Sequence, residues 1–204
     1  MQILKWLIVI VAGYFLGNLN GALIISKSMM KDDVRSHGSG NAGLTNFFRT
    51  YGGFQTLLVI AIDVLKVVVA CWLARLLLPE YGDGAQMIAG AAVVMGHSYP
   101  ALSQFRGGKG ILCGAALAGV IDWRILVIIL SVFILTVALT RYVSLGSILA
   151  ALAFEISFAV LHWGDWVTVI VAVAFASFAI ARHHSNISRL IHGTESKFSF
   201  HKKK

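Results

Sequence analysis

Long runs of apolar residues, separated by short polar joints, make up most of the chain. A helix needs about 20 predominantly apolar residues to cross the hydrocarbon core of a bilayer. The pattern therefore predicts an all-α integral membrane protein with about seven transmembrane helices in one polytopic domain over residues 1–204. The predicted spans are residues 3–25, 54–78, 85–103, 110–121, 125–139, 145–161 and 166–181.

The stretch of residues 110–139 fits this pattern least well. As one helix it would be about 45 Å long, which is too long for a single span without strong tilt. As two helices it would form spans of about 18 and 23 Å, both short for a bilayer. Arg106 and Lys109 before the stretch and Arg141 after it belong on one side of the membrane, which requires an even number of crossings. We therefore expect two spans with a turn at residues 122–124.

With seven spans, the basic residues gather on one side of the membrane. The opposite joints carry Glu80, Asp83, Asp122 and Asp165, with Arg124. Because cytoplasmic joints are enriched in Lys and Arg, the basic side is predicted to be cytoplasmic, with the N-terminus outside and the C-terminus inside. The basic side carries 13 of the 17 Lys and Arg residues, namely Lys27, Lys31, Arg35, Arg49, Arg106, Lys109, Arg141, Arg182, Arg189, Lys197 and the run Lys202 to Lys204.

Composition supports the membrane assignment. The 204 residues are 58% hydrophobic and 13% charged, whereas soluble domains are roughly 45–50% apolar and about 25% charged. Basic joints and attraction to anionic lipid account for the net charge of +8, so no nucleic-acid partner is expected. Cys71 and Cys113 lie in apolar runs without disulfide or zinc spacing, so we expect inert packing residues and no metal site.

The joint that follows the first span is long and rich in glycine. Glycines permit positive φ angles and let backbone N–H groups converge on an anion. Arg49 adds a planar guanidinium that suits phosphate. A plain turn between helices needs far fewer residues than 26–53, and long loops are usually functional or disordered. We therefore favour an anion site over a simple turn. Its neutral residues are Ser39, Gly40, Asn41, Gly43, Thr45 and Asn46, with Gly38 before them.

A second polar segment covers residues 96–110. Lys109 stands among glycines that open an apolar helix, an arrangement that suits phosphate at a helix N-terminus. The segment is not a Walker A loop, because Ser103 and Gly110 stand where that motif needs Gly and Ser/Thr. Two interpretations stay open from these residues alone, a phosphate segment or an ordinary basic joint. His97 is equally consistent with a packed, hydrogen-bonded histidine.

Two further polar segments lie at residues 140–147 and 182–195. Arg182 and Asn186 are four residues apart, which would place them on one helical face. The alternatives are helix caps for the serines of the first segment and a basic snorkelling collar for the second. All four polar segments are predicted on the cytoplasmic side. Such a set favours a site for an anionic cytoplasmic ligand over a transport pathway, which would place polar residues at the midplane.

Ionisable residues also lie in the interior of the predicted spans. Asp63 and Lys66 are three residues apart and are expected to pair on one helix face. His97 and Glu155 are further examples. Intramembrane ionisable residues are functional candidates by default, and structural locks between helices are the alternative.

Taken together in order, the four segments resemble the bacterial acyl-phosphate:glycerol-3-phosphate acyltransferases, the PlsY type of membrane acyltransferase. The resemblance covers roughly residues 13–197. Two places depart from the family pattern, Asn18-Leu19-Asn20 where Ser-x-Pro is frequent and Ile111-Leu112-Cys113 where Val-Ala-Thr is common. The matching motifs are Ser39-Gly40-Asn41-x-Gly43-x-Thr45-Asn46-x-x-Arg49, Gly96-His97…Pro100…Gly107-Gly108-Lys109-Gly110, Arg141-Tyr142-Val143-Ser144-Leu145…Ser147 and Arg182-His183-x-x-Asn186-Ile187…Gly193-Thr194-Glu195.

The resemblance implies a seven-span enzyme of the bacterial inner membrane with a cytoplasmic active site. It would transfer a fatty acyl group from acyl phosphate to the 1-hydroxyl of glycerol 3-phosphate, giving lysophosphatidate and phosphate for phospholipid synthesis. The family needs no metal or other cofactor and does not use acyl-CoA or acyl-carrier protein directly. Its implied partners are the two substrates, membrane lipid and, functionally, an enzyme that forms acyl phosphate.

The resemblance also implies roles for individual residues. Arg49, Lys109, His183 and Asn186 would be catalytic and would hold glycerol 3-phosphate. The assignment of the two phosphates stays open, as does the identity of the base, either His183 or an oxygen of the acyl phosphate. Glu195 is expected to tie down the tail. The donor phosphate would be bound by Ser39, Gly40, Asn41, Gly43, Thr45, Asn46 and Ser147, with Gly107, Gly108 and Gly110 as loop glycines.

Other classes fit less well. No histidine has an aspartate five residues later, which excludes the His-x₄-Asp acyltransferases. Neither proline follows an arginine, which excludes lipid phosphatases of the Arg-Pro type. A small transporter of an organic phosphate or other anion is the remaining alternative, although it predicts inverted repeats that the sequence does not display.

Overall fold

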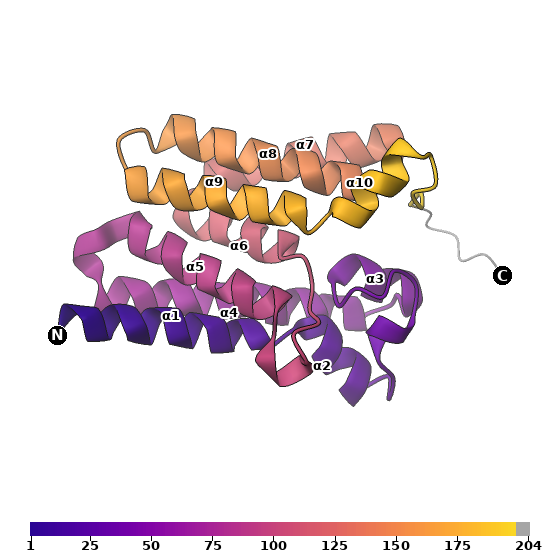
Figure 1. The fold of residues 1–204 in the computed structure, drawn as a ribbon, viewed down its shortest axis with the longest axis horizontal. Coiled ribbons are helices and arrows are strands. Elements are labelled where there is room, and N and C mark those ends of the chain that lie inside the picture. Colours follow the sequence, from indigo (N-terminus) through magenta and orange to yellow (C-terminus); the bar gives the residue numbers. More distant parts are fainter. Residues whose placement is uncertain (199–204) are drawn as a thin grey trace. The chain divides into compact units, whose positions relative to one another are not determined.

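The computed structural model describes residues 1–198, and the predicted charge run Lys202 to Lys204 lies outside these residues. Regular structure in the described part consists of ten α-helices and three short 3-10 helices, with no strand, as an all-α protein requires (Figure 1). The chain divides into two compact units, Met1–Ile121 and Asp122–Lys204. The single domain expected over residues 1–204 stays a prediction.

The first unit is built on the packing of α1 against α5, with α4 against both and α6 against α4 and α5. Small residues let α1 and α5 approach closely, because a Cβ on Gly17 would overlap the carbonyl oxygen of Val93. The elements are α1 (Gln2–Asn18), α2 (Gly21–Ser28), η1 (Val34–Ser36), α3 (Leu44–Thr50), α4 (Gln55–Leu77), η2 (Pro79–Tyr81), α5 (Gly82–Ser98), η3 (Ala101–Ser103) and α6 (Ile111–Ile121).

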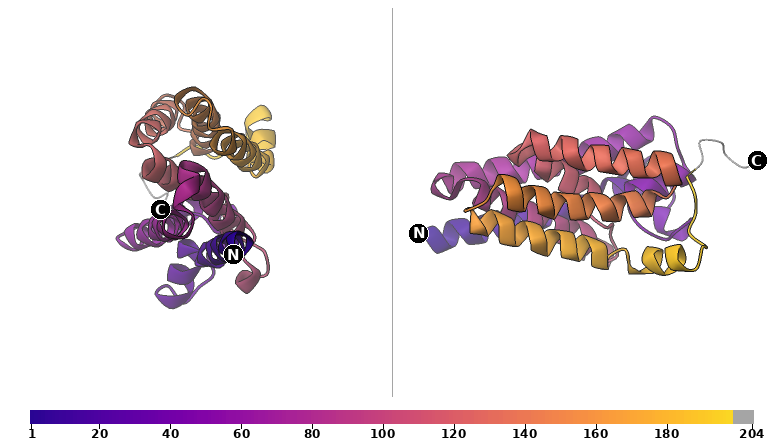
Figure 2. Two further views of the ribbon diagram at one scale, coloured as in Figure 1. Left: turned by 90° about the vertical axis from the view of Figure 1, so that its left-hand side faces the viewer. Right: turned by 90° about the horizontal axis from the view of Figure 1, so that it is seen from above.

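The second unit contains α7 (Trp123–Thr140), α8 (Val143–Leu161), α9 (Trp166–Ala181) and α10 (His184–Ile191). The three long helices lie side by side in chain order, with α8 between α7 and α9 (Figure 2). Phe154 joins α8 to α9, because its ring centroid lies 4.9 Å from that of Phe175.

Each predicted apolar run coincides with helical structure, but two runs are not single helices. The first breaks at Leu19 and Asn20, where the Asn20 Oδ1 atom accepts the Leu23 N–H at 3.0 Å and caps α2. The run 85–103 was too long, since α5 ends at Ser98. Pro100 explains this end, because proline disfavours the helical conformation in the residue before it.

The predicted division of residues 110–139 is confirmed. α6 ends at Ile121 and α7 begins at Trp123. The Asp122 carboxylate accepts the backbone N–H of Arg124 at 2.9 Å and so caps α7.

Helix length gives a smaller number of spans than the sequence predicts. Within the described residues, four helical segments are long and apolar enough to cross a membrane, and a fifth qualifies if the bent pair α9 and α10 counts as one. α5 and α6 are shorter, with 17 and 11 residues. The protein is therefore an all-helical membrane protein, and the count of seven spans stays a prediction.

Candidate functional site

The glycine-rich segment of residues 36–46, here called loop 1, is shaped by Asn46. The buried Asn46 amide donates to the carbonyl oxygens of Val34 at 2.9 Å and His37 at 3.0 Å. Its Oδ1 atom accepts the backbone N–H of Ser39 at 3.0 Å. Asn46, predicted as a donor-phosphate residue, thus uses its side chain to hold loop 1 closed.

The other predicted residues of loop 1 are more accessible. Ser39 and Gly40 are exposed, Asn41 and Thr45 are half-buried, and Gly43 begins α3 as its N-cap. Gly38 and Gly40 have φ angles of 56° and 69°, the left-handed conformation that glycine adopts without strain. As predicted, these two glycines adopt positive φ angles in loop 1.

Arg35 braces the base of loop 1. Its guanidinium forms two parallel bonds to the Asp33 carboxylate, Nε to Oδ1 at 3.0 Å and Nη2 to Oδ2 at 2.7 Å. The hydrogen bonds from Arg35 lower the pKa of Asp33 to about 2. The Arg35 Nη1 atom also donates to the carbonyl oxygen of Ser103 at 2.9 Å, which ties loop 1 to the turn after α5.

Residues 107–110, here called the glycine segment, run back along the end of α5. The backbone N–H of Gly107 donates to the Ser98 carbonyl at 3.2 Å, and that of Gly108 donates to the His97 carbonyl at 3.1 Å. Lys109 is half-buried, and α6 begins directly after Gly110. The predicted placement of a lysine before a helix N-terminus is confirmed. Arg49 lies exposed in the last turn of α3.

Loop 1 and the glycine segment meet at Ala42 and Gly108. A Cβ on Gly108 would lie 2.9 Å from the Ala42 carbonyl oxygen and would overlap the Nε2 atom of His97. Only glycine fits this contact, so the first two polar segments of the sequence lie together at one end of the first unit.

A buried polar cluster lies beneath this contact. The Lys66 ammonium donates to Asp63 Oδ1 at 2.6 Å and to His97 Nδ1 at 2.8 Å. Asp63 also accepts the backbone N–H of Gly21 at 3.1 Å. The expected pairing of Asp63 with Lys66 is confirmed, and the cluster joins α2, α4 and α5. These contacts between helices are those that a structural lock requires, one of the two alternatives that the sequence leaves open.

The same cluster offers three groups of the kind that bind metals. Ligand atoms of Asp63, His97 and Cys113 lie within 4.8 Å of one another. Lys66 donates hydrogen bonds to two of these residues, so a positive charge already occupies the cluster. Asp63 and His97 therefore already accept hydrogen bonds from the Lys66 ammonium at the atoms that would bind a metal.

In the second unit, the remaining predicted residues lie at the ends of helices. Ser147 is buried in α8 and donates to the Val143 carbonyl at 2.9 Å. The buried His183 directs its Nδ1 atom at the Ala179 carbonyl at 2.7 Å. Because a carbonyl only accepts, Nδ1 carries the proton and the lone pair of neutral His183 lies on Nε2.

Glu195 fastens the tail to α10. Its Oε1 atom accepts from the Asn186 amide at 2.7 Å, and its Oε2 atom accepts from Arg189 Nε at 2.6 Å. Burial would raise the pKa of this carboxyl, but the hydrogen bonds that it accepts outweigh burial and lower it. The backbone N–H of Phe198 donates to the Arg141 carbonyl at 2.7 Å. The expected structural role of Glu195 is confirmed, and the tail that follows it lies against Arg141 of the third polar segment.

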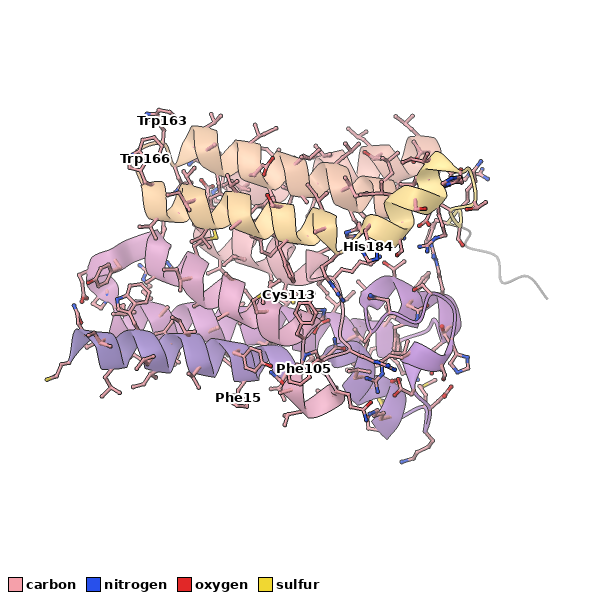
Figure 3. All side chains as sticks on the ribbon, viewed as in Figure 1. Phe15, Phe105, Cys113, Trp163, Trp166 and His184 are labelled. Atoms are coloured by element: carbon pink, nitrogen blue, oxygen red, sulfur yellow. The ribbon has the colours of Figure 1, made fainter. Side chains whose placement is uncertain are left out.

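One prediction for this region is wrong. Arg182 and Asn186 do not share a helical face, because α9 ends at Ala181 and α10 begins at His184. The two helices are bent by 56° at this break, and His184 opens the shorter one (Figure 3). The spacing of four residues has its usual meaning only inside a continuous helix.

Asn20 contacts loop 1 although it lies outside the four polar segments predicted from the sequence. This residue is fully buried, and its Nδ2 atom donates to the Ala42 carbonyl at 2.9 Å and lies 3.4 Å from His97 Nδ1. An asparagine directly before a helical apolar run is a signal for an N-cap. That signal predicts the cap but not the contact with loop 1.

Comparison with known proteins gives consistent results. The family model described as glycerol-3-phosphate acyltransferase matches residues 7–193. A glycerol-3-phosphate acyltransferase of Thermoanaerobacter pseudethanolicus is 41% identical over 187 residues, which cover 92% of each chain.

Two solved structures are also similar. Both are crystal structures of PlsY, an integral membrane glycerol 3-phosphate acyltransferase, one in the glycerol 3-phosphate form and one in the lysophosphatidic acid form. The first has a TM-score of 0.87 and 29% identity and covers 95% of this chain and 96% of its own. The second has a TM-score of 0.84 and covers 95% of each chain. The chain belongs to the glycerol-3-phosphate acyltransferase family of integral membrane enzymes that produce lysophosphatidate.

Proposed function

We propose that the chain transfers a fatty acyl group from acyl phosphate to the 1-hydroxyl of glycerol 3-phosphate. The contact between loop 1 and the glycine segment carries this proposal, because it brings glycine-rich backbone and Lys109 to one end of the first unit. In the reaction, the hydroxyl oxygen attacks the acyl carbonyl, the carbonyl–phosphate bond breaks and inorganic phosphate leaves. The hydroxyl proton passes to a base.

The two phosphates are assigned to different residues. Loop 1 binds the donor phosphate through exposed Ser39 and Gly40 and half-buried Asn41 and Thr45, with Gly43 at the start of α3. The resemblance also assigns Ser147 to the donor phosphate. Asn46 serves this site by fixing the loop, since its amide already bonds three backbone groups. Arg49 and Lys109 bind the phosphate of glycerol 3-phosphate through their positive charges. The resemblance assigns His183 and Asn186 to the same substrate.

His183 is the proposed general base. Its Nδ1–H donates to the Ala179 carbonyl, which leaves Nε2 as the proton acceptor in the neutral ring. An oxygen of the acyl phosphate is the alternative acceptor. The donor is a mixed anhydride with an activated carbonyl, so positioning and stabilisation of the oxyanion supply much of the rate.

For the membrane arrangement we propose seven spans in the bacterial inner membrane, an external N-terminus and a cytoplasmic active site. α5, α6 and α9 are the three short crossings, with 17, 11 and 16 residues, and the bilayer accommodates them by local thinning. In the second unit, Arg141 precedes α8, whereas exposed Trp163 and Trp166 lie at its other end (Figure 3). Arginine is enriched on the cytoplasmic side, which supports this orientation, and the tryptophans mark a membrane interface.

The donor is tested with purified protein, palmitoyl phosphate and labelled glycerol 3-phosphate, with palmitoyl-CoA as a parallel donor and a metal chelator throughout. We expect lysophosphatidate from acyl phosphate alone. Lys109→Ala should lose the product, whereas Lys31→Gln, which removes an exposed charge of the same unit, should retain it. Product from palmitoyl-CoA alone would contradict the proposed donor. Product from neither donor would make uptake of labelled glycerol 3-phosphate into liposomes the next experiment, as a transporter predicts.

A further inference from the structure

We propose that Asn20 is a positioning residue that holds loop 1 in register with the glycine segment. The inference rests on the proposed function, because it concerns how the two phosphate-binding segments are aligned. Asn20 lies in neither segment. It lies at the break between α1 and α2 and is fully buried.

The amide of Asn20 is fixed at both ends. Its Oδ1 atom accepts the Leu23 N–H at 3.0 Å, which caps α2 and sets the orientation of the amide plane. Its Nδ2 atom is thereby directed at the Ala42 carbonyl of loop 1, at 2.9 Å, and at His97 Nδ1, at 3.4 Å. A single rigid group thus connects the start of α2, loop 1 and the end of α5.

His97 extends this connection to the glycine segment. The Lys66 ammonium can only donate, so His97 Nδ1 is an acceptor and the ring proton lies on Nε2. The Nε2 edge of the ring packs against Gly108, with no room for a Cβ between them. The position of the His97 ring therefore sets the position of Gly108, and with it the backbone that carries Lys109.

This connection has a consequence for rate. If loop 1 holds the donor phosphate and Lys109 holds the acceptor phosphate, their relative position sets the approach of hydroxyl to carbonyl. Reacting atoms need to approach to about 3–3.5 Å, and a misplacement of about 1 Å can cost 100-fold in rate. Loss of the Asn20 bridge should therefore lower kcat more than it raises the KM of either substrate.

The test compares Asn20→Ser with Asn18→Ser. Serine at position 20 retains an N-cap for α2 but lacks the amide that reaches Ala42. Asn18 belongs to the same helix break and is also buried, but its amide contacts the Tyr14 carbonyl at 2.8 Å and the Leu102 N–H at 3.1 Å. For each purified protein, kcat, both KM values, the unfolding temperature and hydrogen exchange of the loop 1 peptide are measured.

We expect Asn20→Ser to lower kcat by about tenfold or more, with both KM values within about threefold of wild type. Its loop 1 peptide should exchange faster, whereas Asn18→Ser should change neither kcat nor that exchange. Wild-type kcat and exchange in Asn20→Ser would overturn the inference, even if the unfolding temperature falls. Equal losses of kcat in both variants would also overturn it. If wild-type protein makes no product from acyl phosphate, the donor proposal fails, and the exchange measurement still decides the role of Asn20.

Discussion

Lys66 and Asp63 form a buried ion pair within α4, with the Lys66 Nζ atom 2.6 Å from Asp63 Oδ1. Removal of one partner from a buried pair leaves the other charge without compensation, which costs about 3–5 kcal/mol. We expect Lys66→Met to lower the unfolding temperature strongly. Lys66→Met combined with Asp63→Asn should recover a large part of the loss. Thermal unfolding in detergent measures both, and equal losses in the single and double variants would contradict this account.

Asn46→Ala tests the brace within loop 1. The substitution removes three hydrogen bonds, to the Val34 and His37 carbonyls and from the Ser39 N–H, and each such bond contributes about 0.5–1.5 kcal/mol. We expect loop 1 to open and kcat/KM for acyl phosphate to fall by more than about tenfold. Thr50→Val, which removes a hydroxyl bonded to the Asn46 carbonyl in the same helix, should stay near wild type. Unchanged kinetics in Asn46→Ala would show that loop 1 keeps its shape without the brace.

Arg49→Lys tests whether the acceptor phosphate needs a planar donor. Lysine retains the charge but lacks the fork that binds two phosphate oxygens at once. We expect the KM for glycerol 3-phosphate to rise by about tenfold and the KM for acyl phosphate to change little. Steady-state kinetics with each substrate varied in turn would measure this. A larger rise in the KM for acyl phosphate than for glycerol 3-phosphate would show that Arg49 binds the donor phosphate instead.

His183→Gln tests the proposed base. Glutamine can still bond the Ala179 carbonyl but does not accept a proton at neutral pH. We expect kcat to fall by about 100-fold or more, the scale of general base catalysis. Substantial remaining turnover would indicate that the acyl phosphate takes the proton. His184→Gln, one residue later and exposed, is the matched control.

The Asp33–Arg35 pair predicts an acid-sensitive contribution to stability. The pKa of Asp33 falls to about 2 in the folded protein, below the ordinary value of about 3.9. A lowered pKa stabilises the fold fully above the ordinary value, and this contribution is lost as pH falls from about 4 to about 2. Unfolding temperatures from pH 6 to pH 3 should therefore fall more steeply for wild type than for Asp33→Asn. Parallel profiles would contradict this assignment.

The sequence predicts much of the helical structure because hydrophobic runs and caps are local signals. The division of residues 110–139 is one example, since the length of the stretch and the basic residues on either side of it predict two helices. In the structure, Asp122 caps the second of them. Local signals fail where a helix bends. Arg182 and Asn186 have helical spacing, but the backbone changes direction by 56° between α9 and α10.

The sequence predicts which segments contain the candidate residues, but only the tertiary structure shows what each side chain contacts. Asn46 resembles a phosphate ligand in the sequence, yet its amide bonds the backbone of its own loop. Asp63 and Lys66 were predicted to pair, yet the addition of His97 to that pair depends on how α5 packs against α4.

The sequence by itself determined the all-helical membrane character, the family and the identity of the polar segments, because hydrophobicity and motif spacing are properties of consecutive residues. Only the tertiary structure decided that Ala42 meets Gly108 and that Asn20 joins loop 1 to His97. These contacts link residues far apart in the chain. Their geometry depends on close packing of α1, α4 and α5, which no local pattern specifies.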